Sequence, residues 1–209
     1  MHDKTFEKIS FKEKYPEHYA AEESKVTETI THDFNYMTIA GTEHPQDSKR
    51  FNSAVQLLEW LSFTMKFRLK NDPPQGFFDY NMPPTETVRK NMDKKKEDRK
   101  RKIFLPLPSY IEEARVVNTR RVAQAKTDEK LPQMRFQKWK KRKVIQILHI
   151  WAYGSGKRKV NKLNAYAKKH NLEIKWDYQE VYLNDMRRTK PDNLETIIRF
   201  DVKKAKAAK

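Results

Sequence analysis

Four alternate residues near the C-terminal end of the chain could form one chemically active strand face: Trp176, Tyr178, Glu180 and Tyr182. Side chains alternate between the two faces of a strand, so these four share a face. Burying a carboxylate without a partner is costly, so a glutamate between aromatic rings requires an explanation. One is a pocket in which the rings stack on a flat ligand while Glu180 accepts a hydrogen bond or faces a positive charge. The other is an ordinary half-exposed strand on which Glu180 pairs with a nearby Lys or Arg.

A second group, His149, Trp151 and Tyr153, closes the preceding strand. A lone histidine on an apolar strand is more often a hydrogen-bonded core residue than a catalyst. The six histidines show no metal-ligand spacing and the chain has no Cys, so we expect no metal site. The four glycines cannot form a phosphate-binding loop motif, and we expect no cofactor. Glu86, Asp185 and Glu180 could meet in space, but their spacing alone assigns no acid or base.

The elements that must position these residues follow from hydrophobic periodicity. Helices are expected over 49–69, over 109–126 with a capping box at Ser109 and Glu112, and from about 157 to 170. Trp60, Phe63 and Phe67 widen the apolar face of the first helix. Strands are expected over 33–41, 77–81, 103–107, 131–136, 144–150, 176–183 and 195–202.

Each half of the chain therefore reads strand, helix, strand, strand, over 33–107 and 143–202. This predicts an α+β fold in which two pseudo-repeated βαββ units form an antiparallel sheet. The two main helices lie on one face, and a ligand groove lies on the other face along the pseudo-twofold axis. The expected organisation is a lead-in (1–30), one domain (31–202, with halves of about 31–128 and 140–202) and a basic tail (203–209).

Charge is the strongest compositional signal, because 45 Lys and Arg against 28 Asp and Glu give a formal charge of +17. Two basic runs, 89–102 and 138–143, read as solvated segments that could make weak contact with nucleic acid or another anionic polymer. No helix-turn-helix or RNA-binding motif accompanies them. The chain has no apolar segment of signal-peptide or membrane-spanning length and no Cys, so we expect a cytoplasmic protein that does not enter a membrane. The sequence leaves open whether it is a monomer or a dimer.

Several short motifs occur in the order and spacing of one known family. They are Gln146-Ile-Leu-His149-Ile, Glu180-Val-Tyr182-Leu-Asn-Asp185, Arg188 and Thr196-Ile-Ile-Arg199, with Phe11-Lys-Glu-Lys-Tyr15, Gly76-Phe-Phe-Asp-Tyr80 and Leu105-Pro-Leu-Pro108 before them. The chain resembles, over nearly its whole length, the stand-alone members of the GyrI-like small-molecule-binding family. That resemblance implies two βαββ units around a ligand groove.

Members of that family bind lipophilic, often aromatic or cationic compounds. Some are effector domains of multidrug-responsive transcription activators, one branch inhibits DNA gyrase, and stand-alone members hydrolyse cyclopropane-containing alkylating natural products. The family's Glu-[Ile/Val]-Tyr glutamate lies at the base of the pocket, which corresponds to Glu180 here. The resemblance thus implies binding of a lipophilic, planar aromatic molecule between the two halves. The expected contacts are Glu180, Tyr178, Tyr182, Trp176, Trp151, Tyr153, His149, Tyr80 and Trp60.

Departures from the family pattern fall on the same pocket. Trp151 stands where the family has Gly, Gly156 replaces an acid, Tyr178 replaces a His, and Arg89 stands where the family has Trp. The loss of one Trp and one acid favours binding over hydrolysis. If the protein is an enzyme, Glu180, Tyr153 and Glu86 are the candidates for the reacting groups. A contact with gyrase or nucleic acid through the basic runs is the remaining alternative.

Overall fold

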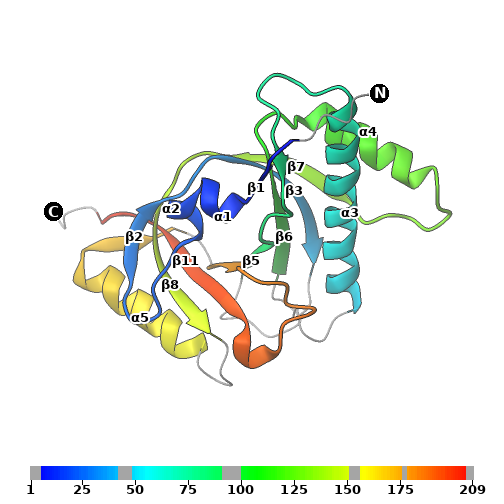
Figure 1. Cartoon of the computed structure of the whole chain (residues 1–209). Coiled ribbons are helices and arrows are strands. Elements are labelled where there is room, and N and C mark those ends of the chain that lie inside the picture. Colours follow the sequence, from blue (N-terminus) through cyan, green and yellow to red (C-terminus); the bar gives the residue numbers. More distant parts are fainter. Residues whose placement is uncertain (1–5, 42–48, 91–99, 151–155, 176–177, 206–209) are drawn as a thin grey trace.

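The computed structural model describes residues 6–41, 49–90, 100–150, 156–175 and 178–205 (Figure 1). The main sheet is antiparallel and nine-stranded, in the order β2-β8-β11-β10-β5-β6-β3-β7, with β9 paired to β11. Its strands are β2 (Thr27–Ile30), β3 (Phe34–Gly41), β5 (Glu86–Lys90), β6 (Lys100–Leu107), β7 (Met134–Trp139), β8 (Lys143–Ile150), β9 (Leu172–Ile174), β10 (Gln179–Tyr182) and β11 (Glu195–Lys204). The fold is α+β, as the periodicity predicts.

Helices and a small second sheet complete the described structure. The helices are α1 (Phe11–Lys14), α2 (Pro16–Tyr19), α3 (Lys49–Asn71), α4 (Glu113–Gln124), α5 (Gly156–Lys169) and a 3-10 turn over Pro191–Asn193. β1 (Lys8–Ile9) pairs in parallel with β4 (Asp79–Tyr80). Within these ranges, no helix is both long and apolar enough to cross a membrane.

The predicted repeat of βαββ units is confirmed. The first unit is β3-α3-β5-β6 and the second is β8-α5-β10-β11. In the sheet they run β8-β11-β10 and then β5-β6-β3, so the second strand of each unit lies at the centre. There, β10 pairs with β5, with Glu180 opposite Thr87 and Val181 opposite Glu86.

The sheet is strongly curled. A flat sheet would put β7 and β8 about 29 Å apart, at about 4.8 Å per strand. Only residues 140–142 join them, which span at most about 14 Å between the strand ends. The sheet must therefore bend until its two ends approach. Arg142 then packs on the Trp139 ring at 4.2 Å and reaches Asp201 of β11.

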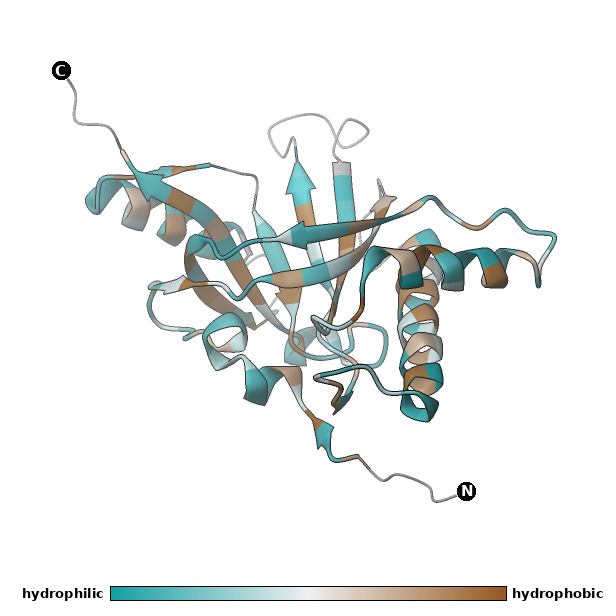
Figure 2. Ribbon diagram, turned by 90° about the horizontal axis from the view of Figure 1, so that it is seen from above, coloured by the Kyte–Doolittle hydropathy of each residue, from teal (hydrophilic) through white to brown (hydrophobic). Residues whose placement is uncertain are grey.

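The two faces of the sheet have different coverings. α3 and α5 pack on one face, which we call the helix face, against Ile103, Leu105, Ile147 and Ile198 among others. The other face, which we call the inner face, lies inside the curl, and the N-terminal helices α1 and α2 cover part of it with Phe11 and Tyr19. Figure 2 shows apolar positions along the central strands and along α3. α3 and α5 lie on either side of the centre of the helix face, which β10 and β5 form (Figure 1).

Local expectations about one strand, one basic run and one helix cap are wrong. The strand expected over 77–81 is only the short β4, and the second strand of the first repeat is instead β5. The basic run 89–102 is therefore not one solvated segment: Arg89 and Arg101 lie in strands and are buried at 8% and 7% exposure, while residues 91–99 fall outside the described residues. The capping box is wrong as well, because α4 begins at Glu113 after the N-cap residue Glu112, without a side-chain cap.

The aromatic residues expected to widen the buried face of α3 point outward. Phe51, Val55, Leu58, Leu61 and Met65 are buried as the spacing predicts, whereas Trp60, Phe63 and Phe67 are 48%, 54% and 63% exposed. The helical period places those three together on a second, solvent-facing stripe.

We expect replacement of Phe67 by Ser to change the free energy of unfolding by no more than about 0.5 kcal/mol, as for a surface site. Leu61→Ala, on the buried side of the same helix, should lower it by about 2–5 kcal/mol. Urea unfolding of both variants measures the contrast. A loss at Phe67 as large as at Leu61 would mean that the stripe is covered.

Candidate functional site

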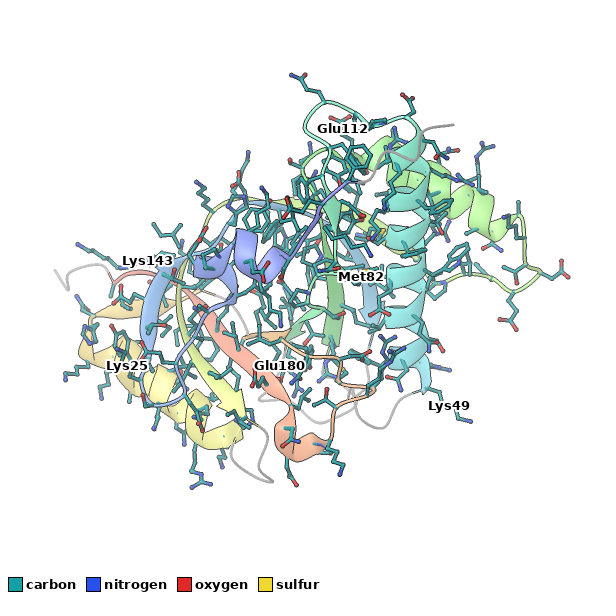
Figure 3. All side chains as sticks on the ribbon, in the orientation of Figure 1. Lys25, Lys49, Met82, Glu112, Lys143 and Glu180 are labelled. Atoms are coloured by element: carbon teal, nitrogen blue, oxygen red, sulfur yellow. The ribbon has the colours of Figure 1, made fainter. Side chains whose placement is uncertain are left out.

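Glu180 lies at the centre of the helix face and is only 4% exposed. Figure 3 shows it between α5 and α3. Three side chains donate to its Oε2 atom: Arg89 Nε at 2.8 Å, the Tyr182 hydroxyl at 2.7 Å and the Thr87 hydroxyl at 3.1 Å. Charge-assisted bonds of this kind are the strong ones. The carboxylate is therefore already held by partners from β5 and β10.

Electrostatics keep Glu180 ionised. Burial by itself raises the pKa of Glu180, but Arg89, Arg101 and the hydrogen bonds from Tyr182 and Thr87 outweigh burial and lower this pKa overall. Burial and the Glu180 charge raise the pKa of Tyr178 to about 12. The Arg89 guanidinium also lies 5.5 Å from the Tyr178 ring centroid. Glu180 is thus a carboxylate with an internal counter-ion. The second explanation from the sequence included such a pairing, but on a half-exposed strand, whereas Glu180 is buried.

The other expected site residues divide into three groups. Tyr178 and Tyr182 share the helix face with Glu180. His149 lies on the same face, because Thr196 of β11 is paired with His149 of β8 on one side and with Tyr182 of β10 on the other. Burial and the nearby Lys159 lower the pKa of His149. Trp151, Tyr153 and Trp176 lie outside the described residues.

Tyr80 and Trp60 belong elsewhere. Tyr80 is fully buried and its hydroxyl lies 2.9 Å from Ser62 Oγ, beneath α3. Trp60 belongs to the exposed stripe of α3. Neither residue is among those that bond to Glu180.

A second buried carboxylate, Glu86, lies on the inner face. His18 Nε2 is 3.0 Å from Glu86 Oε1, the Tyr36 hydroxyl donates to both carboxylate oxygens, and the Gln179 amide donates to Oε2. Burial raises the pKa of Glu86, but the contact with His18 and the charges of Arg199 and Arg142 outweigh burial and lower this pKa overall, so the carboxylate is charged. Burial and Arg199 lower the pKa of His18 to about 4, so His18 is neutral at neutral pH.

The three acids that could have met in space do not. Glu86 and Glu180 occupy opposite faces, because Glu86 lies opposite Val181 and Glu180 lies opposite Thr87. Asp185 accepts from Arg187 Nε at 2.9 Å, and Arg187 also binds Glu59. No described pair of these carboxylates is arranged to share a proton. Among the described residues, no group of three His, Asp or Glu could hold a metal ion.

A cavity of about 1270 Å³ lies beside these clusters, where β3 and β5 end and where β6 and α3 begin, and it extends onto the inner face. Its apolar lining includes Phe51 and Ala54 of α3, Ile103 and Phe104 of β6, and Trp139 of β7. The second repeat contributes Gln179, Arg199 and Asp201. The cavity thus lies between the two halves. Glu180 is not part of its lining, but Arg101, which lies within electrostatic range of Glu180, is.

Most of the cavity lining escaped sequence reasoning. No local pattern marks Arg142 or Phe51 as a site residue, because elements distant in the chain bring them to the cavity. Two signals were available. Trp139 lies inside the basic run 138–143, and Arg199 ends the motif Thr196-Ile-Ile-Arg199.

Comparison with known proteins supports the fold. No protein-family model matches the chain, and no curated protein sequence matches it significantly. A hydrolase from Listeria innocua has 21% identity and a TM-score of 0.81, covering 94% of this chain and 100% of its own. An uncharacterised conserved protein from Listeria innocua has 21% identity, the same coverage and a TM-score of 0.79.

A more distant similarity is to the C-terminal domain of EcmrR, with 12% identity, a TM-score of 0.53 and coverage of 87% of this chain and 98% of that domain. At these identities the likeness is one of fold. It is consistent with the GyrI-like fold expected from the motifs.

Proposed function

We propose that this protein binds a lipophilic small molecule, planar and aromatic in character, in the cavity between its two halves. The observation that carries the proposal is the cavity itself, whose volume is about 1270 Å³ and whose lining mixes aromatic and aliphatic side chains with polar groups. Binding sites for small molecules are typically concave and apolar with a few convergent polar groups. Burial of apolar ligand surface contributes about 25 cal/mol per Å².

Glu180 enters this proposal as part of the wall behind Arg101 rather than as a contact for a ligand cation. Its three internal donors bind Oε2, and Arg89 already balances the charge that a ligand cation would need. The aromatic residues Tyr178 and Tyr182 accompany it. Trp151, Tyr153 and Trp176 remain proposed contacts from outside the described residues.

The alternatives have less support. Hydrolysis of cyclopropane-type compounds needs a group that can polarise the substrate or activate water, yet both Glu180 and Glu86 are buried and held by internal partners. Contact with gyrase or nucleic acid loses part of its basis, since Arg89 and Arg101 of the first basic run are buried. Both alternatives remain predictions.

A thermal-shift titration with planar neutral, anionic and cationic aromatics tests the proposal. A compound present at 100 times its dissociation constant should stabilise the fold by about 2.7 kcal/mol. Ser53, an exposed residue of α3, lines the cavity, so Ser53→Trp should fill the space and weaken or abolish the shift.

Gln56→Trp is the matched control, because Gln56 is exposed on the same helix and does not line the cavity. It should leave the titration unchanged. Equal loss of binding in both variants, or no shift with any compound in the unaltered protein, would refute binding in this cavity.

A further inference from the structure

The charge of the cavity lining is one-sided. Among the described residues, nine basic side chains line it against one acidic side chain, Asp201. The basic residues are Lys49, Arg50, Lys90, Arg101, Lys102, Lys138, Lys140, Arg142 and Arg199. Asp201 is already engaged, since Arg142 Nη1 donates to its two oxygens at 2.7 and 2.8 Å. The lining therefore offers a ligand a large excess of positive charge.

The two nearby glutamates offset only part of this excess. Glu180 is paired with Arg89, which does not line the cavity, and the Glu86 charge acts on Arg199 and Arg142. Lys102 illustrates the result: burial, and then repulsion from Lys90 and Arg135, lower its pKa. Its ammonium group is 5.8 Å from the Phe104 ring centroid, and within the described structure no carboxylate forms an ion pair with it.

Two guanidinium groups at the inner end of the cavity each have one nitrogen without a described hydrogen-bond partner. Arg199 is fully buried, and its Nε has no hydrogen-bond partner among the described residues. Arg142 uses its Nη atoms for Asp201 and Gln179, and its Nε is likewise without a described partner. Both Nε atoms are buried, so these two guanidinium groups add positive charge to the wall of the cavity without offering a ligand a direct hydrogen bond through Nε.

At the other end, α3 begins with Lys49 and Arg50 and has no acidic residue in its first turn. A helix N-terminus carries partial positive charge and favours acids, so two basic residues there add to repulsion instead of relieving it. Figure 3 shows Lys49 at this end of α3. An anion in the cavity would relieve this repulsion as well.

The aromatic part of the lining lies among these charges. Trp139 is stacked under Arg142 at 4.2 Å and contacts Phe104, with ring centroids 4.5 Å apart. We propose that the cavity selects aromatic ligands that carry a negative charge, such as aromatic carboxylates or sulfonates. This inference rests on the proposed function and adds the charge class of the ligand, opposite to the cationic compounds implied by the family resemblance.

Two xanthene dyes of similar shape and opposite charge provide the test: fluorescein, an anion, and rhodamine 6G, a cation. Fluorescence anisotropy at about 0.15 M salt should give a dissociation constant at least about tenfold lower for fluorescein than for rhodamine 6G. Lys102→Gln should weaken fluorescein about fivefold or more and leave rhodamine 6G unchanged or tighter. Lys138→Gln, at an exposed lining position, serves as a second variant should Lys102→Gln not fold.

Lys162→Gln is the matched control, because it removes the same charge from an exposed position of α5 outside the cavity. It should leave both dyes unaffected. Preference for rhodamine 6G, or equal affinity for both dyes, overturns the inference but leaves small-molecule binding intact. If fluorescein, rhodamine 6G and the neutral parent compound xanthone all fail to bind, the proposed function is overturned too. If duplex DNA displaces fluorescein and Ser53→Trp does not weaken its binding, the dye binds the basic surface and not the cavity. That result would overturn the inference.

Discussion

Arg89→Met should lower the free energy of unfolding by about 3–5 kcal/mol, because it leaves the Glu180 carboxylate buried without its counter-ion. The loss should grow with pH. Without Arg89, only Arg101 and the hydrogen bonds from Tyr182 and Thr87 oppose the effect of burial. We expect burial to dominate and to raise the pKa of Glu180 in the folded state above its unfolded value, so that stability falls as pH rises through the usual range of a carboxyl group. Urea unfolding at about pH 5 and pH 8 measures both effects.

Two further variants interpret that measurement. Arg115→Met, at an exposed position of α4, removes the same charge and should change stability by no more than about 0.5 kcal/mol. Adding Glu180→Leu to Arg89→Met should recover part of the loss, because replacing both members of a buried pair by apolar groups is often neutral. A pH-independent loss in Arg89→Met would contradict the pairing.

Acidification from pH 6.5 to pH 4 should destabilise the protein by about 3 kcal/mol through His18 alone. In the unfolded chain His18 takes up a proton near pH 6.5, whereas in the folded protein burial and Arg199 lower its pKa to about 4. Between those values the unfolded state binds more protons, so stability falls as pH falls. Thermal or urea unfolding across this range measures the slope.

His18→Gln isolates the contribution of His18, because the pKa of His149 is also lowered and adds a slope of the same sign. The variant should lose part of its stability at pH 7, where the contact with Glu86 is perturbed, and show a flatter profile between pH 6.5 and pH 5. Measurements above pH 5 avoid most carboxyl titration. Parallel profiles for the two proteins would show that His18 is not the buried group that resists protonation.

The sequence predicts those parts of the fold that local periodicity determines. Both βαββ units, the buried positions of α3 and the strand alternation at Glu180 follow from spacings of two, three and four residues. It fails at β5, because the sequence predicts the second strand of the first unit at 77–81 and a solvated segment over 89–102. Glu86, Thr87 and Arg89 are buried because β5 lies between β10 and β6. Local periodicity could not reveal this, since their partners Glu180 and Gln179 lie more than ninety residues away.

For similar reasons, the sequence predicts the site only in part. The pattern at Tyr178, Glu180 and Tyr182 correctly places them on one face, but periodicity could not reveal that Arg89 pairs with Glu180. The same limit explains Trp60, which satisfies a helical spacing yet faces solvent, because an amphipathic pattern does not show how wide the contact with the sheet is. The cavity depends on the curl of the sheet, which appears only when the short connection between β7 and β8 is set against the strand order.

The docking of the N-terminal helices has a consequence for how the chain folds. Arg199 Nη2 donates to the His18 carbonyl across 181 residues, and Lys12 Nζ donates to the Leu183 carbonyl across 171. These contacts cannot form during synthesis until β10 and β11 have left the ribosome. Because distant contacts slow folding, the earliest segment to be made should be the last to become protected. Amide exchange in α1 and α2 should therefore remain fast after the pairing of β3 with β6 is already complete.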